Sequence, residues 1–306
     1  GQQAKNILDT AREQVAELIN ASPKEIIFTG GGSEGDTMLL LGVAHAYAKK
    51  GKHIITTAVE HHAILHTCQA LEKEGYTVTY LPVDEFGKIE PAAVEAAITA
   101  ETILISVMYA NNEIGTIMPI KEIGAIARKH GVLFHTDAVQ AAGHIPIDVQ
   151  KDNIDLLTLT AHKFHGPKGV GFAFIKKNSM LQPMIFGGEQ EKGMRAGTEA
   201  VHQVVGMAKA LELAYENLEN DTNYISDLKN YCFSELKKIF PDVKINGENT
   251  FYNLLNVQLP LSEEKTSMLL FTLDMKGIAV SRGSACQSGS IKPSHVLAEF
   301  LSPEEA

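Results

Sequence analysis

The sequence predicts an α/β fold in which a mostly parallel sheet is covered by helices. Short apolar, β-branched runs recur along the chain, and segments with a helical pattern lie between them. The 306 residues, with 44% hydrophobic content, are enough to bury a full core. We therefore expect a large domain at residues 1–215 and a smaller α+β domain at residues 216–306.

The expected elements follow in chain order. Residues 1–20 have the amphipathic pattern of a helix, and residues 36–50 predict a second one. Residues 201–240 predict two long helices with a break at 221–223, and residues 265–276 predict a last helix. The apolar, β-branched runs predict strands at residues 25–28, 53–57, 78–81, 102–106, 132–136, 156–160, 170–175, 243–245, 254–259 and 278–281.

Composition excludes several functional classes. The formal net charge of −10, with dispersed Lys and Arg, provides no basic surface for a phosphate backbone, so nucleic acid is not an expected partner. No apolar run approaches the roughly 18 residues of a membrane span, so we expect no membrane partner and a cytoplasmic protein. Cys68, Cys232 and Cys286 are odd in number and far apart, which argues against a disulfide framework and paired-cysteine metal sites.

Four groups with chemical potential follow the expected strands. They are the glycine-rich residues 29–35, His61, Asp137 and Lys163. Ligands bind outside the carboxyl ends of parallel strands, so these groups should meet at one crevice. Lys163 is well placed there for a Schiff base, and Asp137 can neutralise a protonated pyridine nitrogen. Pyridoxal phosphate requires this combination of lysine and aspartate.

The glycine-rich loop, Thr-Gly-Gly-Gly-Ser-Glu-Gly at residues 29–35, joins a strand to a helix. Its backbone N–H groups and the helix N-terminus suit a phosphate group. Two alternatives stay open: a tight turn with a polar helix cap, and a dinucleotide site, because three of the glycines satisfy G-x-G-x-x-G. The dinucleotide pattern is a weak match, since a nucleotide fold has no special use for Lys163 or Asp137.

Three further features have both a functional and a plain interpretation. His61 begins a histidine-rich stretch. Stacking of His61 on a planar cofactor is favoured over zinc binding, because acidic or cysteine ligands at the usual spacing are missing. An exposed histidine pair is the alternative. Asn112 and Gln140 lie in turns, yet in a cofactor crevice they can hydrogen-bond to a ring oxygen. Cys286 lies in a loop of small, polar residues that is rich in glycine. It is either an incidental thiol or a nucleophile that a flexible arm delivers to a cofactor.

Seven motifs occur in the order of one known family. They are Glu-His-His-Ala at 60–63, Asn-Asn-Glu-Ile-Gly at 111–115, His-Thr-Asp-Ala-Val-Gln at 135–140, Ala-His-Lys at 161–163, Gly-Pro-Lys-Gly at 166–169, Arg-Ala-Gly-Thr at 195–198 and Gly-Ser-Ala-Cys at 283–286. Because these motifs are spread along it in this order, nearly the whole chain resembles the NifS/IscS-type cysteine desulfurases. These belong to the aminotransferase class V group of fold-type I pyridoxal phosphate enzymes. The resemblance implies the aspartate aminotransferase-like transferase fold, and the Ser-Ala-Cys loop points to the NifS/IscS branch rather than the Suf-type branch.

The resemblance also implies roles for individual residues. The catalytic residues would be Lys163, which carries the cofactor as a Schiff base, His61, which stacks on its ring, and Cys286, which takes sulfur from L-cysteine as a persulfide and so releases L-alanine. A homodimer is implied, as is an iron–sulfur scaffold or other protein as the sulfur acceptor. The cofactor contacts would be Gly32, Ser33, His61, Asn112, Asp137, Gln140, Thr160, His162, Lys163 and, from the second subunit, Thr198; no metal is expected.

The chain departs from the family in three respects. The phosphate loop usually reads Ser-Gly-Ala-Thr-Glu-Ser, whereas residues 30–35 are richer in glycine, and Arg282 replaces a usual serine. The family's N-terminal segment and its C-terminal substrate-anchoring arginine fall outside residues 1–306, so we expect further sequence at both ends and leave the activity of this chain alone open. Selenocysteine lyase or another class V enzyme is the neighbouring alternative. A nicotinamide-dependent oxidoreductase and an inactive truncated interaction module are alternatives from other classes.

Overall fold

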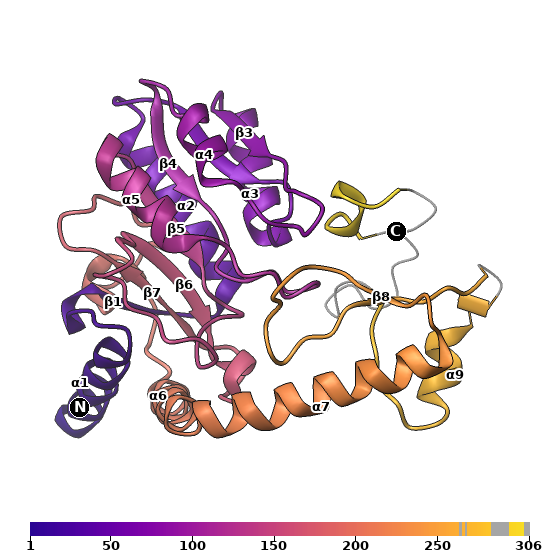
Figure 1. Ribbon diagram of the computed structural model, residues 1–306. Coiled ribbons are helices and arrows are strands. Elements are labelled where there is room, and N and C mark those ends of the chain that lie inside the picture. The colour runs from indigo at the N-terminus through magenta and orange to yellow at the C-terminus, as the bar shows by residue number, and fades with distance from the viewer. Residues whose placement is uncertain (263–264, 267, 283–293, 303–306) are drawn as a thin grey trace.

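A seven-stranded sheet with helices on both faces forms the centre of the computed structural model, which describes residues 1–262, 265–266, 268–282 and 294–302 (Figure 1). The strand order is β1-β7-β6-β5-β4-β2-β3. Strands β3, β2, β4, β5 and β6 pair in parallel, whereas β7 is antiparallel to both β6 and β1. The predicted α/β fold is confirmed. The strands are β1 (Ile26–Thr29), β2 (His53–Thr57), β3 (Thr77–Leu81), β4 (Thr102–Ser106), β5 (Leu133–Asp137), β6 (Leu156–Thr160) and β7 (Gly171–Ile175).

Two hydrophobic cores, one on each face, hold the sheet between its helices. Side chains alternate along each strand, so Ile54 of β2 packs beneath α2 and α3 while Ile55 packs with α1, α5 and α6 on the other face. Each fully buried side chain of this kind contributes roughly 1.5–3 kcal/mol. The helices of this unit are α1 (Gln2–Leu18), α2 (Gly32–Tyr47), α3 (His62–Lys73), α4 (Pro91–Ala97), α5 (Ile120–His130) and α6 (Val201–Glu216).

A buried ion pair ties α1 to the strand that precedes the glycine loop. Arg12 donates to the two carboxylate oxygens of Glu191 at 2.7 and 2.6 Å and to the Ile26 carbonyl at 2.8 Å. The Phe28 N–H donates to the same carboxylate at 2.9 Å. Removing one partner from such a pair leaves an uncompensated buried charge at a cost of about 3–5 kcal/mol. The pair therefore holds β1, and with it the start of the glycine loop, in one position.

The predicted break between the two long helices is wrong in position. The chain breaks at Asn217, between α6 and α7 (Leu218–Ile239), and residues 221–223 lie inside α7. Asn217 donates its side-chain amide to the Leu213 carbonyl at 2.8 Å and so closes α6. Asp221 falls in the first turn of α7, where a negative charge stabilises the helix N-terminus instead of interrupting it.

A second, smaller unit follows α7. It contains a two-stranded antiparallel sheet, β8 (Lys244–Ile245) with β9 (Val257–Gln258), and the helix α9 (Leu269–Asp274). The strand predicted at residues 278–281 is wrong, because none of these residues pairs in a sheet of the described part of the chain. The Ile278 N–H instead donates to the Leu273 carbonyl at 3.0 Å and closes the end of α9.

The last described segment, residues 294–302, returns to the large unit. Val296 and Leu297 belong to the hydrophobic core on the α1, α5 and α6 face, and Phe300 and Leu301 pack against it. Figure 1 shows this segment in yellow, beside the part of the large unit that contains α3 and β3. The domain boundary expected at residue 215 stays a prediction. None of the helices in the described ranges has the length and apolar character required to cross a bilayer.

Candidate active site

The predicted site residues follow strands whose carboxyl ends point to one edge of the sheet. The glycine loop follows β1, His61 follows β2, and Asn112 lies beyond β4. Asp137 is the last residue of β5, and Lys163 lies in the turn after β6. Strand β1 has the same direction as the parallel strands, since two antiparallel pairings with β7 intervene. All five groups therefore share the edge at which ligands bind in parallel sheets.

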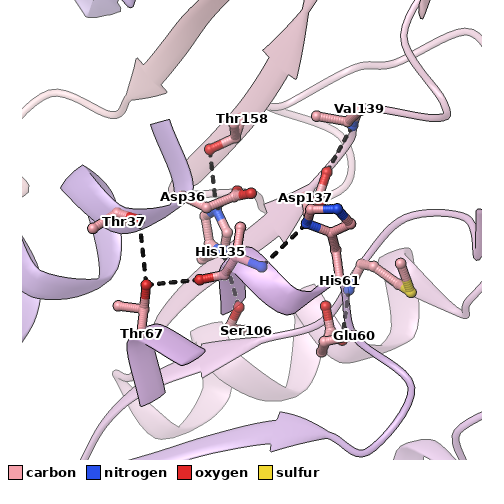
Figure 2. Close-up of polar contacts among 12 residues, drawn as sticks. Asp36, Thr37, Glu60, His61, Thr67, Ser106, His135, Asp137, Val139 and Thr158 are labelled. Carbon is pink, nitrogen blue, oxygen red and sulfur yellow. Dashed lines mark hydrogen bonds and ion pairs between the residues drawn. The ribbon is translucent and has the colours of Figure 1, made fainter. Parts of the chain in front are cut away.

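Asp137 is a buried carboxyl group, with 6% of its surface exposed. Its Oδ1 accepts a hydrogen bond from the Val139 N–H at 2.9 Å (Figure 2). Burial raises the pKa of Asp137, although the Val139 N–H and the charges of His61 and Lys163 act in the lowering direction. A carboxyl group that remains short of positive charge in this position is suited to a cationic ligand.

The glycine loop lies so close to its neighbours that side chains would not fit. Gly31 has φ of 142°, in the region that favours glycine, and is the N-cap of α2. A Cβ on Gly32 would lie 2.8 Å from Val139 Cγ2, and one on Gly31 would lie 3.4 Å from Thr160 Oγ1. The loop backbone and the N-terminus of α2 thus face Thr160, as a phosphate cradle requires. Ser33, in the first turn of α2, is exposed.

Thr160 and His162 meet beside this cradle. Thr160 Oγ1 lies 3.1 Å from His162 Nδ1 and 3.3 Å from the Val170 carbonyl oxygen, to which it donates. Burial, followed by the charges of Lys163 and Lys168, lowers the pKa of His162. His162 is therefore a neutral ring at physiological pH, with hydrogen-bonding capacity next to the loop.

Lys163 is held by a 3₁₀ turn over Ala161–Phe164. Phe164 is buried, which fixes the turn to the core, and Lys163 itself is half-buried. His144 Nε2 donates to the Lys163 carbonyl at 2.9 Å, and His144 Nδ1 accepts from the Tyr252 hydroxyl at 2.9 Å. Burial lowers the pKa of His144, in agreement with this neutral tautomer. The sequence analysis did not find His144, because only folding brings it to the lysine turn.

His61 is oriented by its own helix. It is the N-cap of α3, and its Nδ1 accepts a hydrogen bond from the Ala63 N–H at 3.1 Å. The neighbouring His62 packs edge-on against His66 and His295, with ring centroids 5.0 and 4.5 Å away. In the described part of the chain, no three His, Cys, Asp or Glu side chains are arranged to hold a metal ion.

The turn that carries Asn112 is shaped by Asn111, a residue to which the sequence analysis gave no role. Asn111 Oδ1 accepts from the N–H groups of Glu113 and Ile114 at 2.9 and 3.1 Å, and its Nδ2 donates to the Val59 carbonyl at 3.0 Å. Asn112 is half-buried on the resulting turn. Asn111 thereby links the turn after β4 to the loop after β2, beside the two expected cofactor contacts.

A layer of buried polar groups lies next to Asp137 and was also missed (Figure 2). Asp36, on the first turns of α2, lies 3.6 Å from His135 Nε2, and His135 Nδ1 lies 2.8 Å from Ser106 Oγ. Burial, and next the charge of Asp137, raises the pKa of Asp36 well above its ordinary value. Burial also raises the pKa of Glu60 to about 8 and lowers that of His135 to about 3. Burial thus disfavours the charged form of each of these groups, and the layer offers no positive charge to Asp137.

For Gln140, Thr198 and Cys286, the remaining predicted site residues, the structure gives fewer contacts. Gln140 is half-buried in the turn three residues after Asp137. Thr198 is exposed, in the segment whose Arg195 pairs with Glu34 of the glycine loop at 2.8 Å. Cys286 lies outside the described residues. Of the other two cysteines, Cys68 is buried and Cys232 is exposed, and burial raises the pKa of Cys68 to about 12, so Cys68 is not a reactive thiolate.

The close approach of Gly32 to Val139 predicts a compensating pair of substitutions. Gly32→Ala should destabilise the protein by about 1–3 kcal/mol, because the new methyl group overlaps Val139 Cγ2. Gly32→Ala combined with Val139→Ala should recover most of that loss. Urea unfolding of the wild type, both single variants and the double variant measures the interaction energy. Additive effects of the two substitutions would contradict the packing argument.

Glu60 predicts a pH-dependent stability. Its folded pKa of about 8 exceeds the ordinary value of 4.5, so its contribution is fully present below about pH 4.5 and is lost as the pH rises through 8. Glu60→Gln stays neutral and should be more stable than the wild type by more than about 1 kcal/mol at pH 8, with no difference at pH 4. Urea unfolding of the apoprotein at both pH values measures this, with the exposed Glu85→Gln as control. A difference that does not change with pH would contradict the assignment.

Comparisons with known proteins agree with this geometry. The family model "Aminotransferase class-V" matches residues 1–300. A protein named cysteine desulfurase IscS from Clostridium botulinum (strain Kyoto / Type A2) is 52% identical over 303 residues, which is 98% of this chain and 76% of the relative. One of the same name from Methanosarcina thermophila is 48% identical over 305 residues, covering 100% of this chain and 75% of the relative.

Solved structures give the same result. A NifS-like protein superposes with a TM-score of 0.92 at 36% identity, covering 100% of this chain and 81% of that one. SspA in complex with cysteine superposes with a TM-score of 0.86 at 36% identity, covering 99% of this chain and 85% of that one. The chain therefore belongs to the aminotransferase class-V family and, within it, to the NifS/IscS-type cysteine desulfurases.

Proposed function

We propose that this chain is a pyridoxal phosphate-dependent cysteine desulfurase that converts L-cysteine to L-alanine and leaves the sulfur on Cys286 as a persulfide. The observation that carries the proposal is the pairing of Lys163 and Asp137 at neighbouring strand ends, in a chain about half identical to relatives named cysteine desulfurase. The related SspA, solved in complex with cysteine, supports the substrate assignment. The dinucleotide alternative is not retained, because the family match accounts for the glycine loop as well as for Lys163 and Asp137.

The residues of the site fit this cofactor. Asp137, whose pKa is raised by burial, gains a cationic partner when a protonated ring nitrogen faces it. The backbone of the glycine loop approaches Thr160 at Gly31 and Val139 at Gly32, so its N–H groups are not covered by side chains of the loop and can be offered to a phosphate group. His61 would lie against the ring, Asn112 and Gln140 would hydrogen-bond to its oxygen, and Ser33 and His162 would complete the phosphate contacts.

When bound, pyridoxal phosphate supplies a ring that withdraws electrons from the α-carbon of the substrate. Asp137, with 6% of its surface exposed, would hold a protonated ring nitrogen with its carboxylate. Lys163 Nζ would hold the cofactor covalently, and as a free amine it would take and return a proton at the α-carbon of the substrate. His144 and the buried Phe164 hold the lysine turn during this exchange.

Cys286 completes the reaction as the nucleophile. Its thiolate attacks the sulfur of the bound cysteine, so that a sulfur–sulfur bond forms and the carbon–sulfur bond breaks. Protonation of the remaining carbon skeleton gives alanine. One cysteine and one enzyme thiol thus become one alanine and one enzyme persulfide, which balances atoms and electrons without an external oxidant.

The persulfide is then passed on. We infer a homodimer, in which Thr198 of one subunit reaches the phosphate of the other, because Thr198 is exposed in this chain. An iron–sulfur scaffold or another thiol-bearing protein accepts the sulfur, and the protein acts in the cytoplasm without nucleic acid or membrane. Selenocysteine lyase remains the neighbouring reaction, and the rates with L-cysteine and L-selenocysteine separate the two.

Lys163→Ala should abolish both covalent cofactor attachment and sulfide release. Borohydride reduction of the wild type, followed by digestion and mass spectrometry, should place the cofactor on the peptide that contains Lys163. Lys168→Ala removes an exposed lysine five residues further along the chain; it is the control and should keep both properties. An adduct on any other peptide would refute the assignment of the cofactor lysine.

Cys286→Ala should keep the visible absorbance of the cofactor and lower sulfide release from L-cysteine by more than about a thousandfold, since the proposed acceptor of the sulfur is removed. Cys232→Ala removes the exposed thiol of α7 and should match the wild type. Sulfide assays in the presence of a reductant measure both variants. Undiminished sulfide release from Cys286→Ala would mean that another nucleophile is used.

A further inference from the structure

Ser294 joins the last described segment to the turn that carries Asn112. Its hydroxyl donates to Glu113 Oε2 and accepts from the N–H groups of Val296 and Leu297 at 3.1 and 3.2 Å. Ser294 and Glu113 are 9% and 4% exposed, so water competes little for this hydrogen bond. One hydroxyl therefore serves two purposes: it caps the following turn and bridges to the large unit.

The next residue makes a second connection. His295 Nε2 donates to the carbonyl oxygen of Glu60 at 2.9 Å, immediately before His61 in the chain. The ring of His295 also packs edge-on against His62, with centroids 4.5 Å apart and planes 71° apart. Ser294 and His295 thus attach one segment to two loops, each of which carries an expected cofactor contact.

The attachment is backed by apolar burial and by the small unit. Val296 is fully buried in the main core, which holds the segment against the large unit. The turn at Glu113 is fixed from its other side, because Asn256 Nδ2 donates to the Glu113 carbonyl at 3.0 Å and the Phe251 N–H donates to the Gly115 carbonyl at 2.7 Å. Glu113 is therefore a fixed point to which Ser294 is bound.

The position of this anchor limits the reach of the proposed nucleophile. Cys286 precedes Ser294 by eight residues. A chain extends at most about 3.3–3.6 Å per residue, so the Cα of Cys286 stays within about 28 Å of Ser294 wherever the intervening residues lie. Because Ser294 is bonded to the turn of Asn112 and His295 to the loop of His61, this reach is measured from two of the expected cofactor contacts.

We propose that Ser294, His295 and Glu113 are positioning residues, which anchor the C-terminal end of the segment that carries Cys286 to the turns of Asn112 and His61 and so set how often its thiol reaches the substrate sulfur. The inference rests on the proposed function in one respect, the role of Cys286 as nucleophile. The anchor contacts themselves are independent of it.

A charged residue at position 294 distinguishes the hydrogen bond to Glu113 from the capping of the turn that follows. Ser294→Asp keeps an oxygen acceptor for the N–H groups of Val296 and Leu297, which aspartate caps as well as serine does. It also places a carboxylate against that of Glu113, so the bridge becomes repulsive. Glu113→Gln combined with Ser294→Asp replaces the repulsion by an amide that donates to a carboxylate. If Ser294→Asp acted only by weakening the cap, its effect would not depend on which residue stands at position 113.

Hydrogen exchange of the intact protein measures the anchor without reference to activity. Ser294→Asp should accelerate amide exchange at residues 294–301 by about tenfold or more, because a hydrogen bond to a charged group is replaced by repulsion. Exchange in α2 should not change. The double variant should return to within about threefold of Glu113→Gln alone. Ala298→Asp adds the same charge at an exposed position of the same segment and should match the wild type.

Steady-state kinetics with L-cysteine measure the positioning role. Ser294→Asp should lower kcat by about tenfold, with KM and the visible absorbance of the cofactor unchanged, since only the approach of the thiol is impaired. The double variant should restore kcat, and Ser294→Thr, which retains the hydroxyl, should stay near the wild type. A merely structural defect would change cofactor absorbance or KM together with kcat.

Each outcome decides one of the two proposals. Unchanged exchange in Ser294→Asp would overturn the anchor, and faster exchange with unchanged kcat would overturn the positioning role. A failure of the double variant to recover would also overturn the bridge to Glu113. If the wild-type protein releases no sulfide while exchange behaves as expected, the proposed function fails and the anchor stands.

Discussion

The burial of the Asp137 carboxyl group is the constraint around which the site is organised. Asp137 ends a strand with neighbours on both sides, β4 and β6, so water is excluded from it and its charge must be met by other groups. The nearby Asp36 and Glu60 add no positive charge, and burial raises the pKa values of both. A ligand with a cationic nitrogen supplies what this position lacks.

The side chains proposed to act on the substrate are held by others that do not touch it. His144 holds the carbonyl of Lys163, Asn111 shapes the turn of Asn112, and the Ala63 N–H fixes the ring of His61. In each case the constraint is a hydrogen bond that involves a backbone group. Backbone positions in a packed core vary little, so this arrangement gives exposed or half-buried functional groups a defined geometry.

The smaller unit contacts the same turns. Tyr252 bonds to His144, Phe251 to the backbone of Gly115, and Asn256 to the backbone of Glu113. Lys229 of α7 donates to Thr250 Oγ1 and to the Phe251 carbonyl at 2.6 and 2.8 Å, which ties this stretch to the long helix. The position of the smaller unit is thus linked mechanically to the lysine turn and to the turn of Asn112.

Local pattern was sufficient for the large sheet and for part of the site. The strands at residues 53–57, 102–106 and 156–160 form as predicted, because alternation of apolar, β-branched residues is a property of adjacent positions. Lys163, Asp137 and the glycine loop were singled out because they lie at the ends of such strands. The roles assigned to them, as to Thr198 and Cys286, stay predictions. The predicted helix break at 221–223 and the predicted strand at 278–281 were wrong. The position of a helix end depends on its cap residue, and a strand forms only where a neighbouring strand pairs with it. Only the tertiary structure brings Asp36, Glu60, His135, His144 and Ser294 to the site, because burial, pKa and hydrogen-bond partners depend on neighbours that are distant in the chain.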